Sequence, residues 1–303
     1  MKFVQIMTVG AIMALAISGC SDKASSNSNQ QRPQNKVNNI EVNNTKEGVK
    51  KVEGKATIET SKANDKKMNS VDYSQYYNNQ DKSKVVVSGK QIVWKNKDVT
   101  FTAKLTKAKG EEAAEANEVV DSMKIKSKRG EQLVKLNPRP LRVNSLSLSK
   151  SNQIALHVSD HEGKRLVLIN LSDGTETIVN MFEMNSNGPG SEKIDAYNWS
   201  PDGKKIAFGI GNLGSSYIGV YDVEHKSYTH VSDKDFTLIS SIVWHKEGKS
   251  FDFVSKGDDS PQAILYTYSE SKKSILKKGS LSKNDEQKLA QLTPNFKSES
   301  YEN

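Results

Sequence analysis

The stretch that decides the fold is Tyr197–Asp222, which reads YNWSPDGKKIAFGIGNLGSSYIGVYD. An apolar strand end runs into a polar turn, and a second apolar strand follows. Proline suits the second position of a type I turn, with Ser before it and Gly closing it. The sequence therefore predicts a β-hairpin and then, after a loop over Gly209–Ser216, a third strand over Tyr217–Val223. The predicted structural turn consists of Trp199, Ser200, Pro201, Asp202 and Gly203.

Weaker copies of this phrase occur on both sides of it. One lies about 45 residues later, over Ile242–Phe253, and another about 51 residues earlier, over Leu146–Leu156. A fourth, fainter copy covers Gln91–Phe101. A period of roughly 40–50 residues with several short strands per unit is typical of propeller blades. The predicted fold class is therefore all-β, a β-propeller or partial propeller of about four blades over residues 86–279.

The pattern W-S-P-D-G-K-x-I-A-F at Trp199–Phe208 resembles the TolB-type WD40-like repeat of bacterial envelope propellers. The resemblance covers about residues 140–279. The copy at Leu148 lacks the Trp, Pro and Gly, and the copy at Trp244 has Lys246-Glu247 in place of Pro-Asp. The resemblance implies a propeller whose faces recognise other molecules, while these departures leave blade number and closure open.

The N-terminus reads as a secretory leader. Its apolar run, Phe3–Ile17, is shorter than the roughly 20 residues that span a bilayer and fits the hydrophobic region of a cleaved signal peptide. The following Ser18-Gly19-Cys20 completes a resemblance to the bacterial lipobox. This implies cleavage between Gly19 and Cys20, removing residues 1–19, and attachment of a diacylglycerol and acyl chains such as palmitate to Cys20. We expect a lipoprotein on the extracytoplasmic face of the cell membrane.

Composition divides the rest of the chain. The 303 residues carry a formal charge of +8 and are only 35% hydrophobic, and the single cysteine excludes a disulfide scaffold or a Cys-rich zinc module. Residues 20–85, rich in Asn, Lys, Ser and Gln, predict a disordered tether. Tyr73, Tyr76 and Tyr77, near the end of this tether, are expected to pack onto the start of the folded domain. Good helix formers predict a helical insertion near 110–123, and residues 280–303 predict a polar tail.

Several chemical motifs are better explained as structure. Gly209–Gly214 matches G-x-G-x-x-G, but a strand follows it where a nucleotide site needs a helix. No G-x-S-x-G nucleophile motif occurs, and we expect no hydrolase domain after the repeats. The histidines have no helical ligand spacing and are expected at blade surfaces or edges: His157, His161, His225, His230 and His245. We predict no catalytic residue, cofactor or metal, and no enzyme.

The predicted function is binding. Lys and Arg are spread along the chain and form no dense stripe with interleaved aromatics, so nucleic acid is not the expected partner. We expect a scaffold that binds another envelope protein through Gly209–Ser216, Asn185–Gly190 and Lys256–Pro261, and the lipid bilayer through acylated Cys20. Two alternatives stay open: an enzyme or small-ligand binder using the propeller mouth, and a module for anionic wall polymer or lipid.

Overall fold

The computed structural model describes residues 50–53, 56–59, 68, 70–78, 84–161, 163–179, 193–212, 215–232, 236–257 and 260–294. They all fall within one unit, residues 45–303. The predicted leader, with Gly19 and Cys20, lies outside the described residues, as does the predicted loop Asn185–Gly190.

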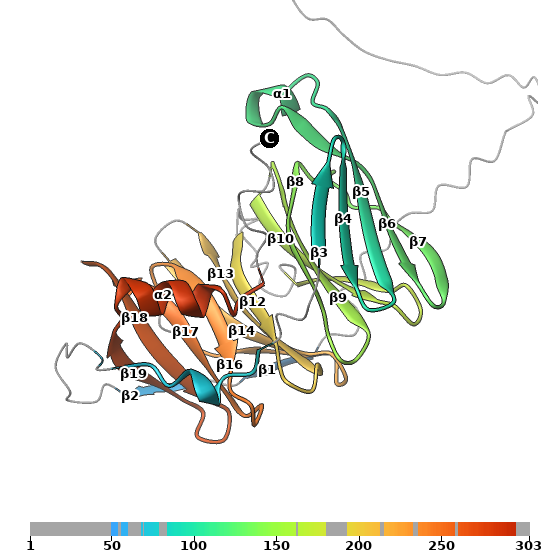
Figure 1. The fold of residues 1–303 in the computed structure, drawn as a ribbon. Coiled ribbons are helices and arrows are strands. Elements are labelled where there is room, and N and C mark those ends of the chain that lie inside the picture. The colour runs from blue at the N-terminus through green and yellow to red at the C-terminus, as the bar shows by residue number, and fades with distance from the viewer. Residues whose placement is uncertain are drawn as a thin grey trace, which may run out of the picture. The chain divides into compact units, whose positions relative to one another are not determined.

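Four sheets follow one another along the chain (Figure 1). The first sheet has five strands in the order β3-β4-β5-β6-β7, over Lys84–Ser88, Gln91–Asn96, Val99–Lys107, Glu118–Ser127 and Gly130–Val134. The second has the order β8-β9-β10-β11, over Arg142–Leu148, Gln153–Asp160, Gly163–Asn170 and Glu176–Ile178.

The third and fourth sheets repeat this meander and each gain a fifth strand from the N-terminal region. Strands β12 to β15 cover Lys193–Trp199, Lys205–Asn212, Ser215–Asp222 and Ser227–His230. Strands β16 to β19 cover Ile239–Trp244, Ser250–Gly257, Ser260–Ser269 and Ser274–Ser280. Within each meander all pairings are antiparallel. The predicted all-β class, with about four propeller-type blades, is confirmed.

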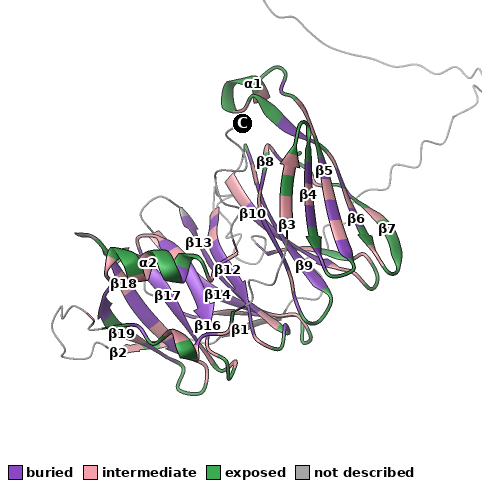
Figure 2. Ribbon diagram, viewed as in Figure 1, coloured by how far each residue is buried: buried purple, intermediate pink, exposed green. Residues whose placement is uncertain are grey.

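The hydrophobic cores lie between successive blades. One cluster joins the first two blades around Trp94 and Phe101, a second joins blades two and three around Trp199, and a third joins blades three and four around Trp244. Strand β9 is buried along nearly its whole length, because neighbouring blades cover both of its faces. Figure 2 shows this as purple on the central strands and green on β7 and the outward side of helix α2.

The predicted tether is partly ordered. Strand β1 (Lys50–Glu53) pairs in parallel with β15, the outer strand of blade three, and β2 (Thr57–Glu59) pairs in parallel with β19, the outer strand of blade four. An outer strand presents unpaired backbone N–H and C=O groups that an extended segment can satisfy, whatever its side chains are. The polar composition of residues 20–85 concealed this pairing, since it depends on the backbone.

The predicted helical insertion and the predicted polar tail both differ from expectation. The insertion near 110–123 contains only the four-residue helix α1 (Glu112–Glu115), because β6 already begins at Glu118 and turns Val119 and Val120 into the core. The predicted polar tail contains helix α2 (Lys283–Ala290), whose Ser282 side chain accepts a hydrogen bond from the Asp285 N–H. Leu289, the buried residue of α2, packs into an apolar cluster with residues of blade four such as Val243 and Leu265.

Two predicted recognition loops are mostly strand. Strand β13 continues through Asn212 and β14 begins at Ser215, so only residues 213–214 separate paired strands where a loop over Gly209–Ser216 was expected. Strands β17 and β18 pair up to Gly257 and Ser260, which likewise shortens the expected loop Lys256–Pro261. The sequence predicted a loop here because Gly209 and Gly211 fall in the second half of β13 and glycine is depleted in strands.

Candidate functional site

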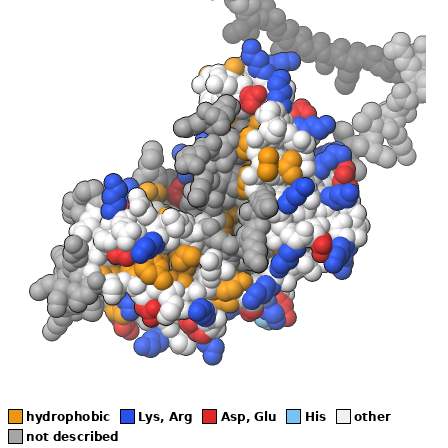
Figure 3. All heavy atoms as spheres, in the orientation of Figure 1, with side chains coloured by type: hydrophobic (Ala, Val, Ile, Leu, Met, Phe, Trp, Pro, Cys, Tyr) orange, Lys and Arg blue, Asp and Glu red, His pale blue; other side chains and the backbone are white. Residues whose placement is uncertain are grey.

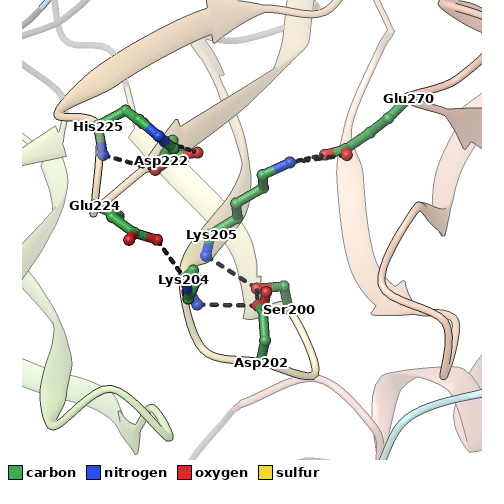
Figure 4. Close-up of polar contacts among 8 residues, drawn as sticks. All are labelled: Ser200, Asp202, Lys204, Lys205, Asp222, Glu224, His225 and Glu270. Carbon is green, nitrogen blue, oxygen red and sulfur yellow. Dashed lines mark hydrogen bonds and ion pairs between the residues drawn. The ribbon is translucent and has the colours of Figure 1, made fainter.

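The phrase that predicted the fold forms the turn between β12 and β13 (Figure 4). The Gly203 N–H donates to the Ser200 carbonyl at 2.9 Å, closing the turn. The Ser200 hydroxyl donates to Asp202 Oδ1 at 2.6 Å and accepts from the Lys205 N–H at 2.9 Å, while the Lys204 N–H donates to the same carboxylate oxygen at 3.0 Å. Every polar residue of the turn therefore stabilises the backbone of the turn itself.

Gly203 also connects blade three to blade two. Its φ is +75°, and a Cβ at this position would lie 2.6 Å from the Lys150 backbone nitrogen, in the β8–β9 turn. The Ser151 hydroxyl donates to the Gly203 carbonyl at 2.5 Å. Only glycine combines this left-handed conformation with so close a backbone approach. The turn sequence thus specifies a contact between blades as well as a local bend.

The same contacts recur one blade further on. The Trp199 indole N–H of blade three donates to Ser147 Oγ of blade two at 3.0 Å, and the Trp244 indole N–H of blade four donates to the Asn198 carbonyl of blade three at 3.0 Å. Gly248, with φ +71°, faces the ring of Pro201. The turns of blades two, three and four therefore contact one another in series. We call them the turn face: Ser149–Asn152, Ser200–Gly203 and His245–Gly248.

Charged side chains next to the turn face are held in pairs. Lys205 Nζ of blade three lies 2.8 and 3.0 Å from the two carboxylate oxygens of Glu270 in blade four, and Lys204 Nζ lies 2.6 Å from Glu224 (Figure 4). Partial burial disfavours the ionised form of Asp202, but hydrogen bonds from the Ser200 hydroxyl and the Lys204 N–H outweigh it and lower its pKa. Asp202 is therefore an anion at neutral pH.

A segment from the predicted tether completes the last turn. In this tyrosine segment (residues 70–78), the Tyr77 N–H donates to the Trp244 carbonyl at 2.8 Å, and the Lys246 N–H donates to the Gln75 carbonyl at 2.9 Å. Its Tyr73 hydroxyl donates to Asp285 of α2 at 2.7 Å. The predicted tyrosine packing thus falls on the last blade, not on the start of the domain.

A buried carboxylate anchors this segment. Asp252, 1% exposed, accepts hydrogen bonds of 2.6 Å from the Tyr76 hydroxyl and from the Thr267 hydroxyl. The Nε2 of His245 lies 3.0 Å from Asp252 Oδ1. Burial lowers the pKa of His245, but the carboxylate beside it more than compensates, and the net pKa is raised. A charged residue within the apolar strand SFDFVS was the sequence signal for this cluster, and sequence reasoning missed it.

The same histidine also approaches a hydroxyl. The Ser250 Oγ lies 2.8 Å from His245 Nδ1, so a Ser–His–Asp chain is present, in the residue types that activate a serine nucleophile. Glu247 also accepts a hydrogen bond from Ser250, and the Tyr76 ring packs edge-on against the imidazole with centroids 5.5 Å apart. The Ser250 hydroxyl and the Asp252 carboxylate are already hydrogen-bonded within the fold. This cluster therefore holds the tyrosine segment on blade four.

His157 contradicts the prediction that all histidines lie at surfaces or edges. It is 6% exposed, and its Nε2 lies 2.9 Å from the Ile194 carbonyl in the neighbouring blade. Its ring packs edge-on against Tyr197. Burial lowers the pKa of His157 to about 4, because the protonated ring would lose its hydration. The imidazole is therefore neutral in the folded protein at ordinary pH.

This burial makes stability depend on pH in a predictable direction. Since the unfolded chain protonates His157 near pH 6.5 and the folded chain only near 4, stability falls as pH drops through this window. The shift corresponds to about 3 kcal/mol. We expect His157→Leu to remove this part of the slope in urea unfolding between pH 7 and 4. The exposed His225→Gln should retain the wild-type slope, and equal slopes for His157→Leu and wild type would contradict the assignment.

One open cleft of about 430 Å³ lies between blades one and two, lined by Arg129, Gln132, Ser172 and Gly174 among others. The Arg129 guanidinium donates to the Ser172 carbonyl at 2.7 Å, and the Gln132 amide donates to the Gly174 carbonyl at 3.0 Å. These side chains thus bridge the two blades.

In the part of the chain that the structure describes, no three His, Cys, Asp or Glu side chains cluster as metal ligands would. Among the same residues, no helix has the length and apolarity to cross a membrane.

Comparison with known proteins finds similarity of structure. No family model and no curated protein matches the chain. TolB from Acinetobacter baumannii is 20% identical over 60% of this chain and 42% of its own, with a TM-score of 0.37. The propeller domain of the Trilobed protease from Pyrococcus furiosus, with an open velcro topology, is 21% identical over 44% of this chain and 41% of its own, with a TM-score of 0.34. The matched region thus spans about two fifths of each of these structures.

The similar structures also correct one prediction. They include an oligogalacturonate lyase in complex with manganese, 11% identical over 64% of this chain and 55% of its own with a TM-score of 0.43, and a puromycin hydrolase, 10% identical over 66% and 29% with a TM-score of 0.37. The prediction that the chain is not an enzyme was therefore wrong, because proteins of similar structure include enzymes. At such low identity and partial coverage, the likeness does not show enzymatic activity either. What the chain has in common with these proteins is a TolB-like β-propeller fold.

Proposed function

We propose that this chain is a lipid-anchored envelope protein whose turn face binds another protein. The observation that carries the proposal is that the turn face presents exposed charged side chains from fixed backbone positions. Those side chains belong to Lys150, Asp202, Lys246 and Glu247.

Rigidity is the property that suits this surface to recognition. Each turn is closed by its own hydrogen bonds and contacts the next turn, so that binding a partner would order little additional backbone. Charges of both signs in fixed positions favour one partner and one orientation over others, since a mismatched pair of like charges is penalised. Short turns on a stable sheet framework are a common place for recognition residues.

The anchoring part of the proposal rests on the sequence. The Ser18-Gly19-Cys20 motif after the apolar run is the support for an acyl anchor at Cys20. Two or more acyl chains attach a protein stably to a bilayer, whereas one does so only marginally. A bilayer anchor would hold the turn face within reach of other envelope proteins.

The proposal is tested by site-specific photocrosslinking in intact cells. A photocrosslinking amino acid at Asp202 or at Lys246 should capture the same protein, identified by mass spectrometry. The matched control is Lys256, an exposed lysine at the opposite end of blade four. It begins the segment Lys256–Pro261 that the sequence predicted to bind, and under the present proposal it should capture that protein only at background level. Equal capture from Lys256, or no common protein from the two turn positions, would refute binding at the turn face.

The same cells test the anchor. Cys20→Ala should abolish acyl labelling, because Cys20 is the single cysteine of the chain. Membrane association with full acyl labelling in this variant would show that the lipid-anchor proposal is wrong, independently of the crosslinking result.

A further inference from the structure

The two ends of the blade series differ in how they are covered. The outer face of blade four is packed against the tyrosine segment and α2, through a cluster that includes Val71, Tyr76, Val243 and Leu289. In blade one, the core cluster lies on the face that carries Trp94 and Phe101. The opposite face of its sheet is the subject of this inference.

The strand register defines that face. Val86, Val93, Thr102, Lys124 and Leu133 are successive cross-strand partners, one on each strand from β3 to β7. Because side chains alternate along a strand, residues two positions away share the face. We call this surface the lysine face: it consists of the row just given together with Lys95, Thr100, Lys104, Ser122, Lys126 and Glu131.

The lysine face combines positive charge with exposed aliphatic side chains. Lys95, Lys104 and Lys126 are exposed, and Lys124 lies 2.6 Å from Glu131, the one acidic residue of the face. Val86 and Leu133, on its two edge strands, are 54% and 53% exposed and are the two large hydrophobic side chains exposed among the described residues. Four strand spacings separate them, about 19 Å. Figure 3 shows blue side chains around a small orange patch in this region.

We infer that the lysine face docks onto an anionic phospholipid bilayer. Lysine heads on flexible stems can reach lipid phosphates, while the aliphatic side chains at both edges enter the boundary between head groups and acyl chains. A bilayer is a flat, extended, anionic surface, which matches a sheet face with a net surplus of lysine. The inference concerns a different surface from the turn face and does not depend on the protein partner proposed above.

Composition favours the bilayer over the other possible occupants. Protein interfaces concentrate their binding energy in Trp, Tyr and Arg and are poor in Lys, and the residues of the lysine face include no aromatic and no Arg. Two copies of the face would repel each other through like charges. A soluble polyanion would gain nothing from Val86 and Leu133, whereas a bilayer would bury both.

The test is vesicle co-sedimentation with the mature chain from residue 21 onward, so that neither the apolar leader nor an acyl anchor at Cys20 contributes. We expect binding to vesicles of phosphatidylglycerol and phosphatidylcholine mixed one to two, and little binding to phosphatidylcholine alone. Replacing Lys95, Lys104 and Lys126 together by Gln should weaken binding about 100-fold, at about fivefold per lysine. The matched control replaces Lys249, Lys256 and Lys272 of blade four by Gln, with the same loss of charge, and should change binding no more than about twofold.

A second variant separates a bilayer from a soluble polyanion. This variant combines Val86→Thr with Leu133→Thr, since threonine is β-branched and suits a strand but has less apolar surface than valine or leucine. The loss of apolar surface should weaken vesicle binding about tenfold. Thermal unfolding of each variant verifies that the fold is intact. Absence of binding to the anionic vesicles, equal losses in the two lysine triples, or no effect of the Val86 and Leu133 pair would each overturn the inference.

Discussion

Replacing Trp199 by Ala is expected to lower the free energy of unfolding by about 3–5 kcal/mol, the range for removing a large aromatic side chain from a core. Trp199 is 1% exposed and belongs to the cluster between blades two and three. Its removal leaves a cavity and also deprives Ser147 of the indole hydrogen bond across the two blades. The measurement is urea unfolding followed by circular dichroism.

Two further variants make the Trp199 result specific. Ser147→Ala leaves the buried indole N–H without its acceptor and should cost about 1–3 kcal/mol. Leu133→Ala, which removes an exposed side chain of blade one, should change stability by no more than about 0.5 kcal/mol. A Trp199→Ala protein as stable as the Leu133→Ala protein would show that the turn phrase does not hold the blades together.

Replacing Asp252 by Ala is expected to cost about 3–5 kcal/mol, as for removal of one partner from a buried charged pair. The hydroxyls of Tyr76 and Thr267 lose their acceptor, and the partly buried His245 loses its counter-charge. Since Tyr76 belongs to the tyrosine segment, we also expect faster amide hydrogen exchange there, with the Tyr77 N–H the most informative probe. Hydrogen exchange with mass spectrometry of residues 70–78 measures this.

The matched control is another aspartate. Asp98→Ala removes a carboxylate whose ion pair with Lys128 is exposed, and should change stability by no more than about 0.5 kcal/mol. Tyr76→Phe removes a single hydrogen bond and should fall between the two variants. Unchanged exchange at residues 70–78 in Asp252→Ala would disprove the anchoring role of this carboxylate.

Local chemistry explains why the repeated hairpin could be predicted. The turn at Ser200–Gly203 needs only a proline of fixed φ, a glycine and a short side chain that bonds its own backbone, and all three are visible in four residues. The period of the phrase then predicts about four blades, since each copy corresponds to one meander. The fainter copies at blades one and two still form hairpins, because alternating apolar residues alone suffice for a strand.

Three features that sequence reasoning missed depend on distant residues. Strands β1 and β2 pair through backbone groups with outer strands more than a hundred residues away. The Tyr76–Asp252 hydrogen bond spans 176 positions. His157 stands in a strand in which any position could face outward, and only the packing of blade three against blade two buries it. No local pattern encodes such contacts.

The sequence by itself thus determined the repeated hairpin, the all-β class and the approximate blade number, because turn propensity and hydrophobic alternation act over a few residues. Tertiary structure alone decided which turns contact one another, where the predicted tether joins the sheets, and which face of blade one remains uncovered. These outcomes are settled by the burial of side chains between blades and by the pairing of free strand edges, and both require the blades to be already formed and adjacent.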